Sequence, residues 1–159
     1  MEQEISREQI KSMFNSYPKE RQYALAVLQD MQQLWNYVPR QGLEALAEHL
    51  DCPLSELYSM ATFYKALSLT PKGKHIIKVC DGTACHIRGS VNLISGIKRA
   101  LGIGPDETTE DGEFSLELVN CVGACALAPV MIIDGAYYGK LTTEALPGIF
   151  EAVRKGAAL

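Results

Sequence analysis

The chain has 159 residues, of which 47% are hydrophobic and 21% are charged, and its formal net charge is −4. This length and composition predict one domain, or one domain with an appendage, around a sizeable buried core. Because the Lys and Arg residues are scattered along an acidic chain, the composition excludes a typical nucleic-acid-binding protein.

The first residues, MEQEISREQI, are polar and acidic, whereas a secretory signal is basic and then apolar. No apolar run approaches the roughly 18 residues that a membrane span requires. We therefore expect a cytoplasmic protein, which would be peripheral to a membrane only through a larger complex.

The first part of the chain has the hydrophobic periodicity of helices. A short helix is expected over residues 6–14, with Ser6 as its N-cap. Apolar residues at helical spacing predict three more helices, over 19–35, 41–50 and 53–67.

The apolar faces of these helices define the core expected in the first half. Phe63 and Tyr64, near the end of the last helix, are expected to anchor it, because aromatic side chains bury large areas. The other residues predicted on buried faces are Leu25, Leu28, Met31, Leu34 and Trp35 in the first long helix, and Leu43, Leu46, Ala47 and Leu50 in the next.

The composition changes at SLTPKGKH, residues 68–75, where Pro71 and Gly73 indicate a turn or linker. Beyond it the hydrophobic period becomes that of strands. We therefore expect two domains, a helical domain over 1–70 and a sheet domain over 71–159.

The second half predicts the order β-α-β-β-α. The first two strands are expected to be parallel, since a helix connects them, and Asp134-Gly135 predicts a tight hairpin between the last two. Pro147 is expected to delay the start of the last helix. The fold class is therefore α+β, with an N-terminal helical bundle followed by a thioredoxin-like mixed β-sheet with flanking helices. The expected elements are strands at 75–80, 114–121, 130–134 and 136–141, a helix at 89–102 with Val91, Ile94, Ile97 and Leu101 on its apolar face, and a helix at 143–156.

Four of the five cysteines stand in two loops of small residues. Cys80 and Cys85 lie in CDGTACHIRG, and Cys121 and Cys125 lie in CVGACALAP, and each loop begins at the end of a predicted strand. If these strands are neighbours, the loops leave the sheet at one edge and the four sulfur atoms converge. Small residues also let backbone N–H groups approach sulfur, and such hydrogen bonds tune iron–sulfur clusters.

The spacing alone leaves more than one chemistry open. The gaps of four and three residues allow a structural Cys₄ zinc site, although zinc ribbons usually have two intervening residues. The sequence contains no pair of cysteines separated by two residues, which a dithiol oxidoreductase uses, and structural disulfides are disfavoured in a reducing compartment. An iron–sulfur cluster takes four thiolates; it is favoured over zinc without excluding zinc.

The chain resembles the thioredoxin-like [2Fe–2S] ferredoxin subunits of NADH:quinone oxidoreductases and of related NAD(P)-linked hydrogenases and formate dehydrogenases. The resemblance covers most of the chain, through YVPR, LAEHL and YSMATFYKAL in the helical half and VCDGTACHIRGS, CVGACALAPV and YYGKLT in the sheet half. It implies one [2Fe–2S] cluster per chain, with Cys80 and Cys85 as ligands of one iron and Cys121 and Cys125 as ligands of the other.

The resemblance also implies an electron-transfer subunit that works beside a flavoprotein subunit, which would hold FMN and NAD(P)H, and beside further iron–sulfur, hydrogenase or dehydrogenase subunits. We expect no catalytic residue, no nucleotide site, no nucleic-acid binding and no membrane insertion in this chain, and we expect the helical half to provide docking surface. The alternatives are a zinc-stapled interaction module on the same four cysteines and a free-standing ferredoxin, which the modest net charge disfavours.

The remaining candidate residues receive simpler interpretations. Cys52 is expected to be a small buried hydrophobe. His86 is expected to be the neighbour of a ligand rather than a ligand, and Asp81, beside Cys80, could shift the cluster potential. His49 and His75 are expected at surface or capping positions.

Overall fold

The computed structural model describes residues 7–156, so the expected Ser6 cap lies outside the described residues. By their internal contacts the residues group into two compact units, Met1–Lys72 and Gly73–Leu159, here called unit 1 and unit 2. Each unit has its own hydrophobic core.

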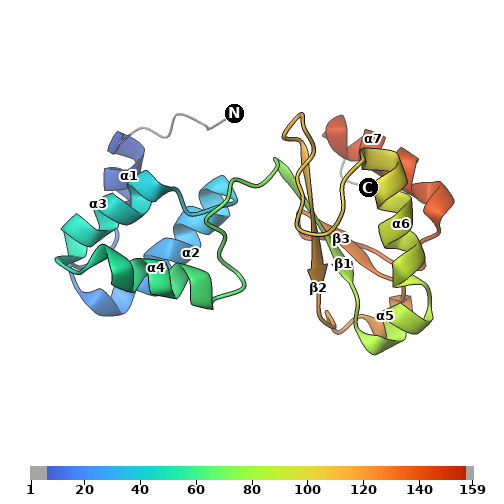
Figure 1. Cartoon of the computed structure of the whole chain (residues 1–159), viewed down its shortest axis with the longest axis horizontal. Coiled ribbons are helices and arrows are strands. Elements are labelled where there is room, and N and C mark those ends of the chain that lie inside the picture. Colours follow the sequence, from blue (N-terminus) through green and yellow to red (C-terminus); the bar gives the residue numbers. More distant parts are fainter. Residues whose placement is uncertain (1–6, 157–159) are drawn as a thin grey trace. The chain divides into compact units, whose positions relative to one another are not determined.

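The described part of unit 1 is helical (Figure 1). The helix expected from residue 19 begins instead as the 3-10 helix η1 (Arg21–Tyr23). The α-helices are α1 (Arg7–Phe14), α2 (Ala24–Trp35), α3 (Arg40–Leu50) and α4 (Leu54–Phe63). Pro39 and Pro53 are the N-cap residues of α3 and α4.

The core of unit 1 lies between these helices, and the sequence predicted only part of it. Leu28 and Met31 of α2 are buried, as predicted, but the buried stripe continues through Ala24 and Val27, so Leu34 is exposed, contrary to the prediction. The buried residues of α3 include Leu43, Leu46 and Leu50, as predicted.

The prediction that Phe63 and Tyr64 anchor the core is wrong. Phe63 is 80% exposed and Tyr64 is 40% exposed, and their rings lie edge to face with centroids 5.1 Å apart. Helix α4 buries Leu57 and Ala61, one turn apart. Residues two apart on a helix do not share a face, so Phe63 points away from the core once Ala61 points toward it.

The two histidines expected at surface or capping positions are both partly buried, and the His75 side chain is 15% exposed, so the prediction of a surface position is wrong. The His49 ring lies 5.0 Å from the Phe14 ring, and its Nε2 is shielded from solvent. His75 lies 5.5 Å from Phe114, and its Nδ1 lies 2.5 Å from Asp134 Oδ2. Both rings are covered because they pack against buried aromatic side chains.

Unit 2 is built on a mixed sheet with the strand order β2-β1-β3-β4 (Figure 1). Strand β1 (His75–Cys80) pairs in parallel with β2 (Phe114–Val119) and antiparallel with β3 (Met131–Ile133), which pairs antiparallel with β4 (Ala136–Tyr138). Both pairings that the sequence predicted are confirmed. The hairpin turns at Asp134 and Gly135, whose φ angles of 49° and 89° suit a two-residue turn.

Three α-helices accompany this sheet in the described residues. The short α5 (Thr83–Ile87) follows β1, and α6 (Ser90–Leu101) then leads back toward β2 and ends at Gly102, whose φ is 75°, as predicted. Helix α7 (Leu146–Arg154) follows the 3-10 helix η3 (Thr143–Ala145) and has Pro147 in its first turn, so the regular helix does begin late.

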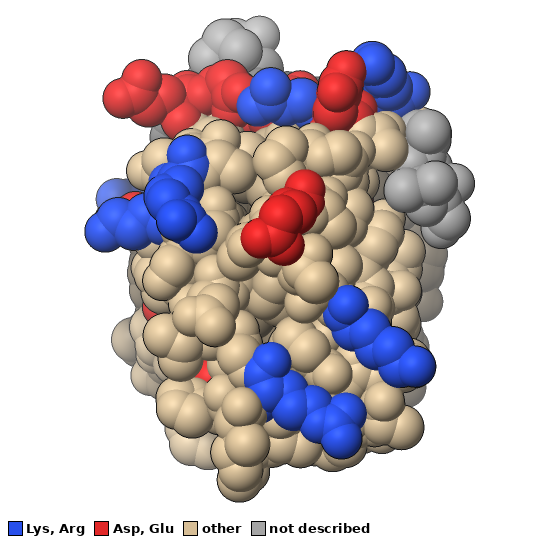
Figure 2. All heavy atoms as spheres, turned by 90° about the vertical axis from the view of Figure 1, so that its right-hand side faces the viewer, with Lys and Arg blue, Asp and Glu red and all other residues tan. Residues whose placement is uncertain are grey.

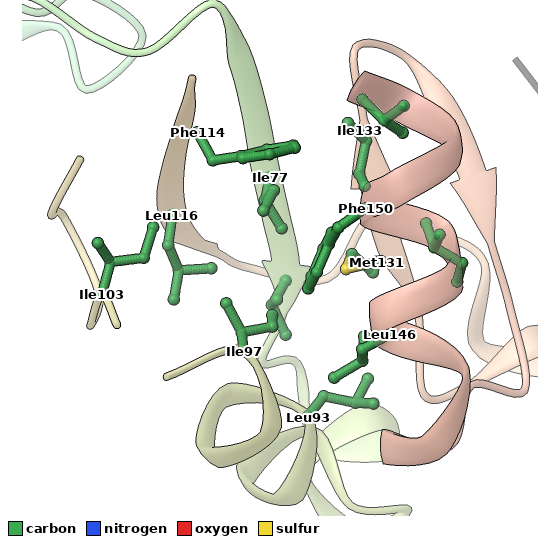
Figure 3. Close-up of a cluster of buried hydrophobic side chains, with 13 residues drawn as sticks. Ile77, Leu93, Ile97, Ile103, Phe114, Leu116, Met131, Ile133, Leu146 and Phe150 are labelled. Carbon is green, nitrogen blue, oxygen red and sulfur yellow. The ribbon is translucent and has the colours of Figure 1, made fainter. Parts of the chain in front are cut away.

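Helices α6 and α7 cover one face of the sheet and close the core of unit 2 (Figure 3). On α6 the buried large apolar side chains are Leu93 and Ile97, whereas Val91, predicted on the apolar face, is exposed. The core brings together Ile77, Phe114, Leu116, Met131 and Ile133 from the sheet with Leu93, Ile97, Leu146, Ile149, Phe150 and Val153 from the helices.

Replacing Phe114 tests this core. The side chain is fully buried and lies 5.7 Å from the Phe150 ring, so Phe114→Ala should lower the free energy of unfolding of unit 2 by about 3–5 kcal/mol through lost burial and a residual cavity. Tyr137→Ala, at an exposed position on β4, is the control and should change it by less than about 0.5 kcal/mol. Urea denaturation measures both, and equal losses would contradict the placement of Phe114.

Candidate functional site

The two cysteine pairs lie at the carboxyl ends of the parallel strands β1 and β2. Cys80 is the last residue of β1, and Cys85 lies in α5. The strand predicted to end at Cys121 ends earlier, where Val119 pairs with Cys80. Cys125 begins the 3-10 helix η2 (Cys125–Leu127). Both loops therefore leave the sheet at the same edge, as the sequence predicted.

Backbone contacts hold the two loops together. The Asp81 N–H donates to the Val119 carbonyl at 2.9 Å, and the Cys80 N–H donates to the Val130 carbonyl at 3.1 Å. A Cβ atom on Gly82 would lie 2.9 Å from the Cys121 Cβ, which is too close for a real side chain. Glycine at this position therefore lets the loop of the first pair approach the loop of the second.

The cysteines form two pairs of different exposure. The sulfur atoms of Cys121 and Cys125 are 3.5 Å apart, and both residues are exposed. Cys80 and Cys85 are each only 2% exposed, and their thiols are hydrogen-bonded to each other. The Cys125 thiol is close enough to act electrostatically on both members of the buried pair. The structure thus brings the four predicted residues together at one end of unit 2.

The surroundings of these thiols shift their pKa values in different directions. Burial raises the pKa of Cys85, and the hydrogen bond to Cys80 adds to this, while an N–H from Val130 opposes it. The Gly123 N–H donates to the Cys121 sulfur and lowers the pKa of that thiol, and a hydrogen bond from Cys125 lowers it further. The same hydrogen bond raises the pKa of Cys125.

The donor set fits a cluster that two pairs of thiolates hold. Within residues 7–156, no three His, Cys, Asp or Glu side chains are placed to hold one metal ion. The thiols are instead grouped in pairs, as in Cys121 and Cys125. A [2Fe–2S] cluster takes four cysteine thiolates. In this chain the N–H groups of Gly123 and Val130 donate to the sulfur atoms of Cys121 and Cys85.

Asp81 takes part in a polar network beside the first pair. Its Oδ1 accepts hydrogen bonds from the Ser90 hydroxyl at 2.6 Å and from His86 Nδ1 at 2.9 Å. The hydrogen bond from Ser90, and then that from His86, lowers the pKa of Asp81. His86 Nδ1 thus points toward Asp81. Ser90 was missed in the sequence, where only its place at a helix start could have drawn attention to it.

Cys52 lies apart from the four cysteines, in unit 1. It is partly buried and packs at the edge of that unit's core, and burial raises the pKa of its thiol. The interpretation of Cys52 as a small hydrophobic residue agrees with this placement.

The cysteine end of unit 2 carries few charged side chains outside its first loop, which contains Asp81, His86 and Arg88. Residues 118–133 contain no Asp, Glu, Lys, Arg or His, and the apolar side chains of Ile87 and Leu127 are exposed beside the cysteines of α5 and η2. In Figure 2, charged side chains crowd the upper edge of unit 2, while the lower half, toward α5, carries basic side chains on a surface that is otherwise mostly uncharged. Glu113, at the end of the acidic loop 104–113, lies at the opposite ends of β1 and β2, where its carbonyl accepts from the His75 N–H.

A mixed sheet with helices on one face and four cysteines on its strand-end loops defines a thioredoxin-like domain with a thiolate site. Residues 10–154 match the family model of the thioredoxin-like [2Fe-2S] ferredoxins. The chain belongs to this family, and its cofactor is a [2Fe–2S] cluster.

Two relatives illustrate the range of the family. The chain is 34% identical over 134 residues to the NADP-reducing hydrogenase subunit HndA of Solidesulfovibrio fructosivorans, in a match that covers 84% of this chain and 78% of that protein. It is 38% identical over 145 residues to an NADH-quinone oxidoreductase subunit of Rickettsia bellii, in a match that covers 89% of this chain and 87% of that protein.

A solved structure supports the fold. The NAD+-reducing [NiFe]-hydrogenase in the air-oxidized state matches with a TM-score of 0.72 and 23% sequence identity, over 86% of this chain and 23% of that chain. At this identity the likeness concerns the fold alone, and it agrees with the predicted α+β class.

The order in which the thiols react tests the geometry of the site. In apo-protein at neutral pH, iodoacetamide should modify Cys121 first, because the thiolate is the nucleophile, its pKa is lowered and its side chain is exposed. Cys80 and Cys85 should react last, since they are buried. Peptide mass spectrometry over time gives the four rates. Urea is the control and should make the rates similar; similar rates in the folded protein would contradict the arrangement.

Proposed function

We propose that this chain is a one-electron carrier that holds its [2Fe–2S] cluster with Cys80 and Cys85 on one iron and Cys121 and Cys125 on the other. The observation that carries the assignment is the convergence of the two pairs at one sheet edge, at the ends of β1 and β2. The family supplies the kind of cluster. The cluster, when bound, takes up and releases one electron.

The residues around the cysteines would hold the thiolates and set the potential. The N–H groups of Gly123 and Val130 donate to the sulfur atoms of Cys121 and Cys85. Hydrogen bonds of this kind favour negative charge on sulfur, and in iron–sulfur proteins they raise the reduction potential of the cluster. The small residues of both loops would leave room for it.

We further propose that the chain works as a subunit beside a flavoprotein subunit that binds FMN and NAD(P)H, with further iron–sulfur, hydrogenase or dehydrogenase subunits. The names of the relatives, a hydrogenase subunit and a quinone oxidoreductase subunit, support this. The low charge of the cysteine end supports it independently, because the buried centre of protein interfaces is depleted of charged residues. The chemistry on NAD(P)H would belong to the partner, and this chain would be non-catalytic.

The two units would act as separate domains, unit 2 for the cluster and unit 1 for assembly. Exposed aromatic side chains are typical of interaction sites, and Phe63 and Tyr64 provide such a pair at the end of α4. Across the described residues, no helix is long and apolar enough to cross a membrane. We propose that the protein acts in the cytoplasm and is tied to any membrane through its complex.

Spectroscopy of cysteine variants tests the cluster assignment. Anaerobically purified protein should be brown, bleach on dithionite reduction and give a rhombic S = 1/2 EPR signal. Cys80→Ala, Cys85→Ala, Cys121→Ala and Cys125→Ala should each lose most of the colour, whereas Cys52→Ala should keep it, because Cys52 lies in the other unit. Colourless wild-type protein with stoichiometric zinc would refute the electron-transfer function.

Assembly with the flavoprotein tests the role of unit 1. The double variant Phe63→Ser with Tyr64→Ser should keep the cluster and its EPR signal but lose co-purification with the flavoprotein subunit by at least about tenfold, as expected for two interface aromatics. Tyr137→Ser, an exposed tyrosine of unit 2, serves as a control for general loss of surface aromatics. Unchanged co-purification of the double variant would show that Phe63 and Tyr64 do not belong to the docking surface.

A further inference from the structure

The Asp81 carboxylate is fixed from two sides beside the buried cysteine pair. One oxygen, Oδ1, accepts both the Ser90 hydroxyl at 2.6 Å and His86 Nδ1 at 2.9 Å. Hydrogen bonds to an ionised acceptor are about twice as strong as those between neutral groups. Ser90 is fully buried, so its hydroxyl needs an acceptor inside the protein.

This carboxylate connects three segments that define the position of Cys85. Asp81 follows Cys80 at the end of β1, and its own N–H is tied to Val119 of β2. His86 is the residue after Cys85 in α5, and Ser90 is the first residue of α6. The strand end, the helix that carries the second cysteine and the long helix of the core therefore meet at one carboxylate.

Helix α5 needs such an external tie. It has only five residues, and helices of this length are not stable by themselves in water. The Gly89 that precedes α6 has no side chain with which to cap that helix, and its φ is 103°. The position of Cys85 relative to Cys80 thus depends on contacts that cross between segments, and the Asp81 network provides two of them.

We propose that Asp81 is a positioning residue for the cluster, which holds the Cys85 turn through Ser90 and His86 and places a fixed negative charge beside the ligands. This inference rests on the proposed function, since it assumes that the four cysteines hold the cluster. Asp81 itself binds no iron in this proposal.

The geometric part is tested on full-length, cluster-loaded protein by the rate at which an iron chelator removes the visible absorption. Asp81→Ala removes the hydrogen bonds from both Ser90 and His86 and should lose the cluster at least about tenfold faster, since one charge-assisted hydrogen bond alone corresponds to about that change. Ser90→Ala should also lose it faster, and the double variant should lose it no faster than Asp81→Ala. Ser95→Ala is the matched control on α6, because its hydroxyl donates to the Val91 carbonyl of the same helix, and it should behave like wild type.

The charge is tested separately by Asp81→Asn, whose amide oxygen still accepts from Ser90. This variant should keep the cluster nearly as long as wild type but show a higher midpoint potential, because reduction adds negative charge and the nearby carboxylate opposes it. The EPR spectrum of Asp81→Ala should broaden as the Cys85 turn becomes less uniform. A merely structural role would lower the melting temperature and leave the potential and the spectrum unchanged.

The outcomes separate this inference from the function on which it rests. Wild-type protein without a cluster would overturn both. Wild-type protein with a cluster, and Asp81→Ala with the same loss rate and the same EPR spectrum, would overturn the positioning role alone. Equal behaviour of Ser90→Ala and Ser95→Ala would overturn it as well, even if Asp81→Ala were too unstable to purify.

Discussion

The parallel pairing of β1 with β2 is the constraint on which the rest of unit 2 depends. Cysteines 41 positions apart in the chain can share one site only because the two strands point the same way and end side by side, with Cys80 opposite Val119. The crossover through α6 makes this pairing possible, because parallel strands need a long connection. The same crossover places Leu93 and Ile97 over the sheet, so the core that stabilises the unit also fixes the edge at which the thiols meet.

Local signals allowed the strands, the hairpin and the helix ends to be predicted. Asp134-Gly135 and Gly102 occupy positions that need positive φ, and these needs are readable from residue type alone. The cysteine pairs could be placed because each follows a strand. What the sequence did not reveal was which apolar side chains would be covered. Phe63 and Leu34 are as hydrophobic as their buried neighbours, and only the packing of each helix decides which stripe turns inward.

The polar contacts of the site were equally beyond sequence reasoning. Asp81 and Ser90 are nine positions apart, and nothing in their spacing indicates a hydrogen bond; the bond exists because α5 turns the chain back toward the end of β1. His75 was misjudged for the same reason. It was expected at a surface or capping position, but a partner from the hairpin turn and an aromatic neighbour from β2 cover most of its side chain.

With the proposed ligands, the unequal exposure of the two cysteine pairs would make the two ends of a bound cluster inequivalent toward a redox partner. Electron tunnelling through protein slows steeply with each ångström of separation, so the sulfur atoms nearest the surface dominate the coupling to any external donor or acceptor. Cys121 and Cys125 are exposed, whereas Cys80 and Cys85 are buried against Ala128 and Val130. Electrons would thus enter and leave through the loop 121–125, and the buried pair would hold the cluster on the side away from the partner.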